Sequence, residues 1–292
     1  MEDCVRTHDY RYGVKRSYLI KECMKCGFGI TVRDFSTDEL KACYERNYNY
    51  SAVPRKRITS LRALVGRFFR RGENALLRHA QGRVLDFGSG QGGMLQQLEK
   101  RGCQAVGTDF SNEACDNLTR AGFKICTLLE LESETHNGTF DAVLLSQVFE
   151  HLDRPDDFLK TFYRLVKPGG KIILAVPNFG SIYRKIFGPY WGGYHVPYHL
   201  FHYTKNSLTL LLRQHGFVCI KVWYSTPFHF PLVSLISYLR RNKMDGTSIE
   251  THLLFRNLIL KVTMALLVII GDMFVPASQK DCLFLTAVKL PD

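Results

Sequence analysis

Apolar and polar positions change their period regularly between residues 83 and 176. Short apolar runs alternate with longer segments whose apolar residues recur every three or four positions, as in helices. This pattern predicts strands at Val84–Phe87, Gln104–Asp109, Lys124–Thr127, Phe140–Leu145 and Lys171–Val176, and helices over 91–101, 112–121 and 154–166. Because strands and helices alternate, we expect an α/β fold with a parallel sheet covered by helices on both faces.

The pattern differs after Pro177. An aromatic, histidine-rich loop precedes further elements, predicted as a helix over 205–215 and strands at Val218–Trp223 and Cys282–Val288. A long apolar segment occupies 228–275. Its run Phe230–Leu239 is too short to span a bilayer, and Leu253–Val275 is interrupted by charged residues, namely Arg256, Lys261 and Asp272. We therefore expect buried or interfacial helices in this segment.

The region before residue 83 has a different composition. Residues 1–50 are rich in tyrosine, cysteine and charge, whereas Arg55–Arg71 carries seven basic residues and no acid. Apolar residues at helical spacing in 51–82 predict a basic amphipathic helix, with Leu61, Leu64, Val65, Phe68 and Phe69 on one face. Such a helix suits a membrane surface or an anionic ligand, or it simply packs on the main domain with a solvated basic face.

Composition narrows the protein class. The 292 residues are 46% hydrophobic and 23% charged, which is typical of a globular chain with an ample core. A net charge of +12 favours anionic partners. Nine scattered cysteines do not form a disulfide framework, and the first residues lack a signal-peptide pattern. We therefore expect a reducing, cytoplasmic location.

The most informative chemistry lies where the first predicted strand ends. Asp86 is followed by a glycine-rich turn, Gly88-Ser89-Gly90-Gln91-Gly92-Gly93, and then by a predicted helix. Glycines permit positive φ angles and close approach of a ligand to the backbone, and the helix start offers free N–H donors. An acid at the end of the next strand, Asp109, can accept from both hydroxyls of a ribose. Gly88-x-Gly90-x-x-Gly93 alone also fits a dinucleotide site.

Three downstream motifs separate these alternatives. They are the strand Phe140–Leu145 with its ending Ser146-Gln147-Val148-Phe149-Glu150-His151-Leu152, the turn Lys167-Pro168-Gly169-Gly170 before the next strand, and His199-Leu200-Phe201-His202-Tyr203-Thr204 before Gly216-Phe217. With the glycine-rich turn and Asp109, the chain resembles class I S-adenosylmethionine-dependent methyltransferases of the small-molecule type over most of residues 80–290. A nicotinamide-linked dehydrogenase is not expected to show these three motifs.

The resemblance implies a Rossmann-like sheet of seven strands whose last strand, here Cys282–Val288, inserts antiparallel between the fifth and sixth. It places the methionine end of S-adenosylmethionine over the glycine turn, beside Asp86, Ser146 and Gln147, and the ribose at Asp109. The full set of cofactor-binding residues that it implies is Asp86, Gly88, Ser89, Gly90, Gly92, Asp109, Phe110, Ser146 and Gln147. The region Leu128–Leu131 is the expected adenine edge.

Methyl transfer to a hydroxyl or an acidic carbon also needs a base to remove a proton. His151 follows the fourth predicted strand, and histidine titrates near neutrality, so it is the first candidate; packing at the loop start is the alternative. His195, His199 and His202 are rivals in the loop after Pro177. Tyr194, His195 and His199 are the predicted substrate contacts, and Tyr190 and Trp191 either join them as an aromatic wall or belong to an ordinary core.

A possible metal site lies near the N-terminus. Cys23-x-x-Cys26-Gly27 has the spacing of a zinc knuckle. Many similar methyltransferases begin with a zinc ribbon of two such pairs, but here only Cys4 and His8 precede the knuckle. Either Cys4, His8, Cys23 and Cys26 form a site for zinc, or the ribbon is degenerate and has lost its metal.

The sequence thus predicts an enzyme that methylates a small molecule, most simply a hydroxyl on a sugar, glycan precursor or lipid-like quinol. C- or N-methylation, and a regulatory protein that binds the cofactor without turnover, are alternatives. No nucleic-acid partner is expected. The predicted domains are 1–50 as a zinc-ribbon-like or accessory segment, 51–82 as the basic amphipathic helical region and 83–292 as the methyltransferase domain. Within it, the apolar insert at 228–275 suits membrane contact, a homodimer or a hydrophobic acceptor pocket.

Overall fold

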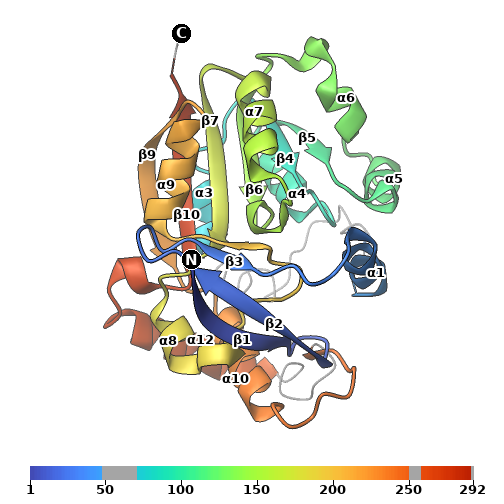
Figure 1. The fold of residues 1–292 in the computed structure, drawn as a ribbon. Coiled ribbons are helices and arrows are strands. Elements are labelled where there is room, and N and C mark those ends of the chain that lie inside the picture. Colours follow the sequence, from blue (N-terminus) through green and yellow to red (C-terminus); the bar gives the residue numbers. More distant parts are fainter. Residues whose placement is uncertain (48–70, 250–257, 291–292) are drawn as a thin grey trace. The chain divides into compact units, whose positions relative to one another are not determined.

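The computed structural model describes residues 1–47, 71–249 and 258–290 (Figure 1). They belong to two compact units. The hairpin unit comprises Met1–Asn47, Pro177–Leu208 and Trp223–Leu283. The sheet unit comprises Tyr48–Val176, Thr209–Val222 and Phe284–Asp292. The predicted basic helix over Arg55–Arg71 lies almost entirely outside the described residues.

The sheet unit is built on a six-stranded sheet with the order β5-β4-β6-β7-β10-β9. Its strands are β4 (Arg83–Phe87), β5 (Gln104–Thr108), β6 (Phe140–Ser146), β7 (Val166–Pro177), β9 (Phe217–Ser225) and β10 (Cys282–Lys289). β4 pairs in parallel with both β5 and β6, and β6 pairs in parallel with β7. The last strand lies between β7 and β9, in the position that the sequence predicts.

The prediction of seven strands is wrong by one. The segment Lys124–Thr127 contributes only an isolated bridge, in which Ile125 pairs with Gly107 of β5. Pairing stops there because Thr127 already begins a helix: its hydroxyl accepts from the Glu130 backbone N–H, and the Glu130 carboxylate accepts from the Thr127 backbone N–H. The capping box therefore ends the strand before a ladder can form.

Helices flank this sheet, as the alternating pattern predicts (Figure 1). They are α3 (Arg71–Leu76), α4 (Gly93–Lys100), α5 (Asn112–Arg120), α6 (Leu128–Glu132), α7 (Pro155–Leu165) and α9 (Lys205–Gln214), with one-turn helices η1 (Glu134–His136) and η2 (Phe149–His151). Apolar side chains of α7 enter the core, where the Phe162 ring packs 4.9 Å from that of Phe87 in β4. Each helix thus covers an apolar strand that could not face water.

The hairpin unit contains an antiparallel sheet with the order β1-β2-β3-β8. Its strands are β1 (Glu2–Asp9), β2 (Val14–Glu22), β3 (Gly29–Thr31) and β8 (Phe201–His202), and its helices are α1 (Thr37–Asn47), α8 (Ile182–Phe187), α10 (His229–Leu239) and α12 (Leu258–Asp272), with short turns η3 (Gly188–Tyr190) and η5 (Ala277–Gln279). Because β8 comes from the loop after Pro177, the first 47 residues share one unit with segments far along the chain.

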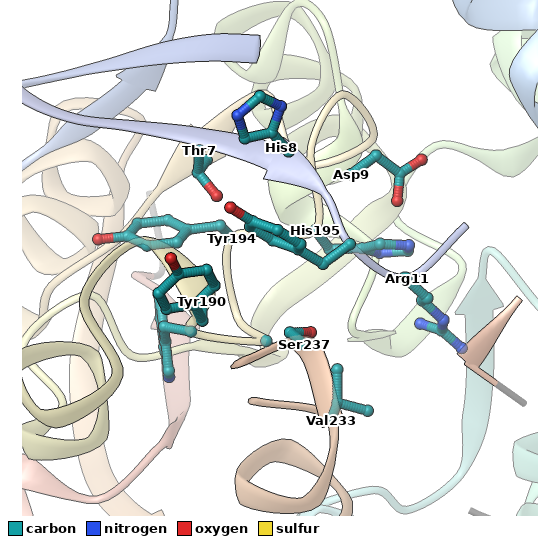
Figure 2. Close-up of a pocket in the computed structure, with 12 residues that line it drawn as sticks. Thr7, His8, Asp9, Arg11, Tyr190, Tyr194, His195, Val233 and Ser237 are labelled. Carbon is teal, nitrogen blue, oxygen red and sulfur yellow. The ribbon is translucent and has the colours of Figure 1, made fainter. Parts of the chain in front are cut away.

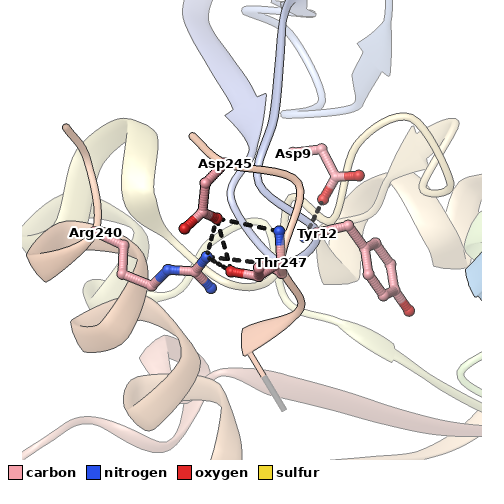
Figure 3. A network of polar contacts seen from close by, with 5 residues as sticks. All are labelled: Asp9, Tyr12, Arg240, Asp245 and Thr247. Carbon is pink, nitrogen blue, oxygen red and sulfur yellow. Dashed lines mark hydrogen bonds and ion pairs between the residues drawn. The ribbon is translucent and has the colours of Figure 1, made fainter. Parts of the chain in front are cut away.

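A polar network closes the turn of the β1–β2 hairpin against the loop after α10 (Figure 3). The Arg240 guanidinium donates to Asp245 Oδ1 at 2.9 Å and to Thr247 Oγ1 at 2.6 Å. The Gly246 backbone N–H then donates to the Gly13 carbonyl at 3.1 Å. Gly13 has φ 66°, and a Cβ there would lie 2.9 Å from the Gly246 nitrogen, so a side chain would prevent this contact.

No helix among the described residues is long and apolar enough to cross a membrane. α12 is the most apolar of those in the predicted insert, but it has 15 residues. At about 1.5 Å per residue it is shorter than a hydrocarbon core of about 30 Å.

A buried carboxyl anchors the end of the hairpin unit. Asp281 Oδ1 accepts from the Trp191 indole N–H at 2.9 Å and from the Ser181 hydroxyl, whereas Oδ2 is buried without a partner among the described residues. Burial raises the pKa of Asp281 to about 7, and the nearby Asp272 adds to the shift. The neutral carboxyl is therefore favoured in the folded chain at mildly acidic pH.

This pKa predicts a pH dependence of stability. The pKa of Asp281 in the folded state lies above the ordinary value. Its contribution to the free energy of unfolding is therefore complete below about pH 4 and is lost as the pH rises through 7. Asp281→Asn resembles the protonated form. We expect its free energy of unfolding to fall less steeply than that of the wild type between pH 5 and 7, by up to about 1.4 kcal/mol per pH unit. Urea titrations at several pH values measure this slope.

The exposed Asp116→Asn is the matched control and should keep the wild-type slope. Equal slopes for Asp281→Asn and the wild type would contradict this account of Asp281.

Candidate functional site

The candidate site is built at the carboxyl end of β4, the strand between β5 and β6. The apolar residues Val84, Leu85 and Phe87 are buried, and they carry Asp86 into the core with them. Parallel strands deliver their carboxyl ends to one edge, so Ser146 at the end of β6 lies at the same edge of the sheet. This topology explains how residues 60 positions apart can line one site.

The turn after β4 folds only because of its glycines. Gly88, Gly90 and Gly92 have φ angles of 78°, 50° and 81°. A Cβ on Gly88 would lie 2.6 Å from a Val148 methyl, and one on Gly92 would lie 2.5 Å from a Leu118 methyl. On Gly90 a Cβ would meet nothing within 4 Å. Gly88 and Gly92 thus allow neighbouring side chains to pack against the turn, whereas Gly90 borders open space.

The turn is tied to the end of β5. The backbone N–H groups of Gly88 and Ser89 both donate to the Thr108 carbonyl at 2.9 Å. The Gly90 N–H donates to Asp109 Oδ2 at 2.8 Å, and the Ser111 N–H donates to Asp109 Oδ1 at 3.0 Å. Asp109 therefore holds the turn in place, while the Ser111 side chain caps α5 by accepting from the Ala114 backbone N–H. Each carboxylate oxygen keeps a further lone pair for a ligand hydroxyl.

A hollow of about 180 Å³ opens beside this turn. It is lined by Asp86, Gly88, Ser89, Gly93, Met94, Gln97 and Ser146. Pockets for complete small ligands commonly measure about 300–1,000 Å³, so the hollow suits one end of a nucleotide-sized ligand. Four predicted cofactor residues line it, namely Asp86, Gly88, Ser89 and Ser146.

Three lining residues were missed by the sequence analysis. Gly93, Met94 and Gln97 belong to the first turns of α4, where Gln97 Nε2 donates to the Gly93 carbonyl at 3.4 Å. Their spacing was the available signal, because positions 93 and 97 share the helix face that begins at the glycine turn. The other predicted cofactor residues, Gly90, Gly92, Asp109, Phe110 and Gln147, do not line the hollow.

Asp86 dominates the electrostatics of the hollow. Its side chain is 2% exposed, and its Oδ2 has no partner among the described residues. Burial raises the pKa of Asp86 to about 7, a hydrogen bond from Ser89 opposes this, and the charge of Asp109 adds to it. A buried acid without a partner is costly, so the hollow is prepared for a cationic or N–H-donating ligand group.

Phe110 and Gln147 follow the carboxyl ends of β5 and β6, respectively. Phe110 follows Asp109 directly and is 53% exposed, with its ring edge-on to Phe87 and Phe158 at 5.6 and 5.7 Å. Gln147 has φ 57°, uncommon for a residue with a side chain, and its N–H donates to the Ala175 carbonyl at 2.8 Å. Strained backbone at the end of β6 is typical of functional positions.

His151, the predicted base, ends the one-turn helix η2. Its two neighbours Phe149 and Glu150 are buried, whereas His151 is half-buried. Its backbone N–H donates to the Val148 carbonyl at 3.0 Å, and Val148 occupies the space that Gly88 leaves free. The glycine turn therefore fixes the loop that carries His151. Burial also raises the pKa of the neighbouring Glu150 to about 8.

The predicted substrate residues lie in the hairpin unit. Tyr194 and His195 line a crevice together with Thr7, His8, Asp9, Tyr10, Arg11, Tyr190, Trp191, Gly192, Val233 and Ser237 (Figure 2). Its volume of about 20 Å³ holds about one water molecule. His199 is buried, with Nδ1 2.8 Å from the Gly193 carbonyl. This contact ties the His199 ring to the backbone of its own loop.

His202 is not suited to be a base. It is buried, its Nε2 lies 3.0 Å from Thr31 Oγ1, and its ring stacks on Phe179 at 5.2 Å. Burial and the positive charge of Arg184 lower the pKa of His202 to about 3. The imidazole is consequently neutral and packed, and this rival to His151 is set aside.

The strand register excludes the predicted four-ligand metal set. Cys23 and Cys26 lie on the turn between β2 and β3, and Cys4 Sγ contacts Glu22 Oε2 at 3.2 Å nearby. His8, however, pairs with Ser17. Five strand positions separate Ser17 from Glu22, roughly 17 Å. His8 therefore cannot share an ion with the two knuckle thiols, and its Nδ1 lies 2.9 Å from the Lys15 carbonyl instead.

Comparisons with known proteins agree with this geometry. A family model described as "Methyltransferase domain" matches residues 54–222, more than half of the chain. A "[4+2]-Cyclase SpnF" structure aligns with a TM-score of 0.50 at 17% identity, covering 88% of this chain and 93% of that one. It supports the fold alone, and its name indicates that this fold also occurs in a cyclase.

Curated relatives match a shorter part. They include the "Ubiquinone biosynthesis O-methyltransferase" of Xanthomonas oryzae pv. oryzae, 29% identical over 113 residues, and its mitochondrial namesake from Homo sapiens, 30% identical over 107 residues. These matches cover 36% and 33% of this chain, and 47% and 29% of the relatives, less than half of either. The family match confirms the resemblance to class I S-adenosylmethionine-dependent methyltransferases, and the chain belongs to the methyltransferase-domain family.

Proposed function

We propose that the chain transfers a methyl group from S-adenosylmethionine to a hydroxyl of a small molecule. The observation that carries this proposal is the buried carboxyl of Asp86, whose Oδ2 has no partner among the described residues, in a hollow beside a glycine-rich turn. S-adenosylmethionine, when bound, supplies a methyl group on a sulfonium together with an amino group that fits this carboxylate. The donor set thus suits the group.

Different residues around the hollow would bind different parts of the cofactor. Asp86 would accept from the amino group, and the backbone of Gly88 and Gly93 would form the surface against which the methionine part lies. Asp109 keeps lone pairs for two ribose hydroxyls beyond its bonds to Gly90 and Ser111. The exposed ring of Phe110, the residue after Asp109, offers an apolar face for the adenine of the cofactor. Alignment of this kind supplies several kcal/mol toward methyl transfer.

For a hydroxyl acceptor, His151 is the proposed base. A hydroxyl attacks more readily as its proton leaves, and an imidazole that is half-buried can take that proton and pass it to solvent. Val148 packs into the space left by Gly88, so the imidazole is carried by the same turn that holds the cofactor.

The names of the curated relatives favour a quinol-like acceptor over a sugar or glycan precursor. We therefore propose the phenolic hydroxyl of a catechol or quinol as the acceptor class. Incubation with S-adenosylmethionine and protocatechuate, a water-soluble catechol, tests the proposal: mass spectrometry should detect one added methyl group on oxygen. Cofactor binding without methylation of any acceptor in a catechol, sugar and amine panel would instead support a binding protein.

Cofactor affinity should depend on pH through Asp86. Its pKa of about 7 must fall when a cationic amino group binds, so binding releases a proton and weakens as the pH falls below 7. We expect the dissociation constant to be more than tenfold larger at pH 5.5 than at pH 7.5. Calorimetry in two buffers of different ionisation enthalpy counts the released proton.

Asp86→Asn should bind more weakly than the wild type at pH 7.5 and lose this dependence, whereas the exposed Glu113→Gln should keep it. A wild-type affinity that does not change across this range would contradict the role of Asp86.

A pair of glycine variants separates cofactor contact from backbone strain. Gly90 and Gly102 both have positive φ, and a Cβ on either meets nothing within 4 Å. They lie before and after α4, respectively. Each alanine variant should lose about 1–2 kcal/mol of stability. Only Gly90→Ala should lose cofactor affinity, by tenfold or more, because its methyl group enters open space next to Asp109, the proposed ribose contact; calorimetric titration measures this. Equal affinity losses would point to strain alone.

Replacing His151 should affect turnover and not cofactor binding. His151→Asn removes the proton acceptor, so we expect kcat with protocatechuate to fall by about 10²–10⁴. The dissociation constant for S-adenosylhomocysteine should stay within about twofold of the wild type. His79→Asn, outside the site, serves as the control. An unchanged kcat in His151→Asn would remove His151 from the proposal.

A further inference from the structure

The helix α12 of the hairpin unit, labelled in Figure 1, exposes apolar side chains along one face. The exposed residues are Val262, Leu266, Leu267 and Ile270, followed just beyond the helix by Met273 and Phe274. The last two are 76% and 83% exposed. Their spacing of three and four positions places them on one side of the helix. From Val262 to Gly271 the sequence contains no charged residue.

The opposite side of α12 is already used for packing. Ala265 and Val268 are buried, and Met264 packs against a cluster of Leu232, Ile236 and Ile249. Among the described residues, α12 therefore packs on the rest of the hairpin unit through that side. Single exposed apolar residues are ordinary, but four on one face of a helix with two more directly after its end indicate an interaction surface.

The surroundings of this face are basic. Residues 177–208 contain no acid, and their bases include Lys185, which is exposed beside the exposed Ile186 on α8. α8 lies next to the end of α12, because a Cβ built on Gly271 would lie 3.7 Å from the Tyr183 hydroxyl.

Nearby acids contribute little negative charge to the surface. Asp272 is held by Lys280 at 3.4 Å and by the Thr226 hydroxyl at 2.8 Å, and only 15% of its side chain is exposed. Asp281 is fully buried. Elsewhere in the same unit, the loop after α10 carries Arg241 and Lys243, both exposed, while Asp245 is bonded to Arg240. An uncharged apolar strip in an acid-poor, basic region complements a surface that is apolar within and anionic at its edge.

We propose that α12 docks on an anionic lipid membrane, with its axis along the surface and Leu266, Ile270 and Phe274 inserted among the acyl chains. The 15 residues of α12 are too short to cross a bilayer, which leaves the interfacial position. A second copy of the chain would bring the same positive charge to the contact, whereas anionic headgroups neutralise it. The proposal does not depend on methyl transfer, and its test needs no cofactor.

Flotation of the full chain with vesicles tests this surface. We expect binding to phosphatidylcholine vesicles that contain phosphatidylglycerol, and much weaker binding to phosphatidylcholine alone. Ile270→Gln with Phe274→Gln should reduce the bound fraction at limiting lipid by about tenfold or more, because two large apolar side chains no longer leave water. Lys185→Glu should reduce binding to the anionic vesicles only.

Matched controls come from equally exposed apolar residues elsewhere. Leu129→Gln on α6 and Leu210→Gln on α9 should bind vesicles like the wild type. Affinity for S-adenosylhomocysteine should be unchanged in all these variants, so a failure here is distinct from a failure of the proposed function. Three results would overturn the proposal: no vesicle binding by the wild type, binding unaffected by the α12 variants, or a dimeric mass that only these variants convert to a monomer.

Discussion

The site depends on one electrostatic constraint, the burial of the Asp86 carboxyl at the end of an apolar strand. β4 lies between two parallel neighbours, so the acid that ends it is removed from water along with Leu85 and Phe87. The chain satisfies neighbouring backbone groups through Thr108 and Asp109 but leaves Asp86 Oδ2 without a partner among the described residues. A buried carboxyl oxygen without a partner raises the free energy of the empty site. A ligand group that donates a hydrogen bond to it removes this cost.

The glycine turn converts that constraint into a binding surface. Gly88 and Gly92 are small because Val148 and Leu118 occupy the space that side chains would need, and this packing fixes both the loop of η2 and the start of α4. Cofactor residues and the proposed base His151 are therefore positioned by one local structure. A change at Gly88 should therefore alter both the binding surface and the loop that carries His151.

Local sequence predicted much of this arrangement and failed where distant contacts decide. The strands at β4, β5 and β6 and the acid at each of the first two ends were readable, because burial and alternation are local signals. The strand predicted at Lys124–Thr127 does not form, because the Thr127 capping box begins a helix there. His202 looked like a candidate base until its burial against Phe179 was known. Spacing suggested His8 as a zinc ligand, but the β1–β2 register places it opposite Ser17. Hydropathy found α12 without indicating which side of it is exposed.

The central claim, that the turn after Asp86 holds S-adenosylmethionine, is tested most directly by calorimetric titration of the wild-type chain with S-adenosylmethionine and, separately, with NAD. We expect saturable binding of S-adenosylmethionine at one site per chain and no detectable binding of NAD. Binding of NAD, or of neither compound, would contradict it.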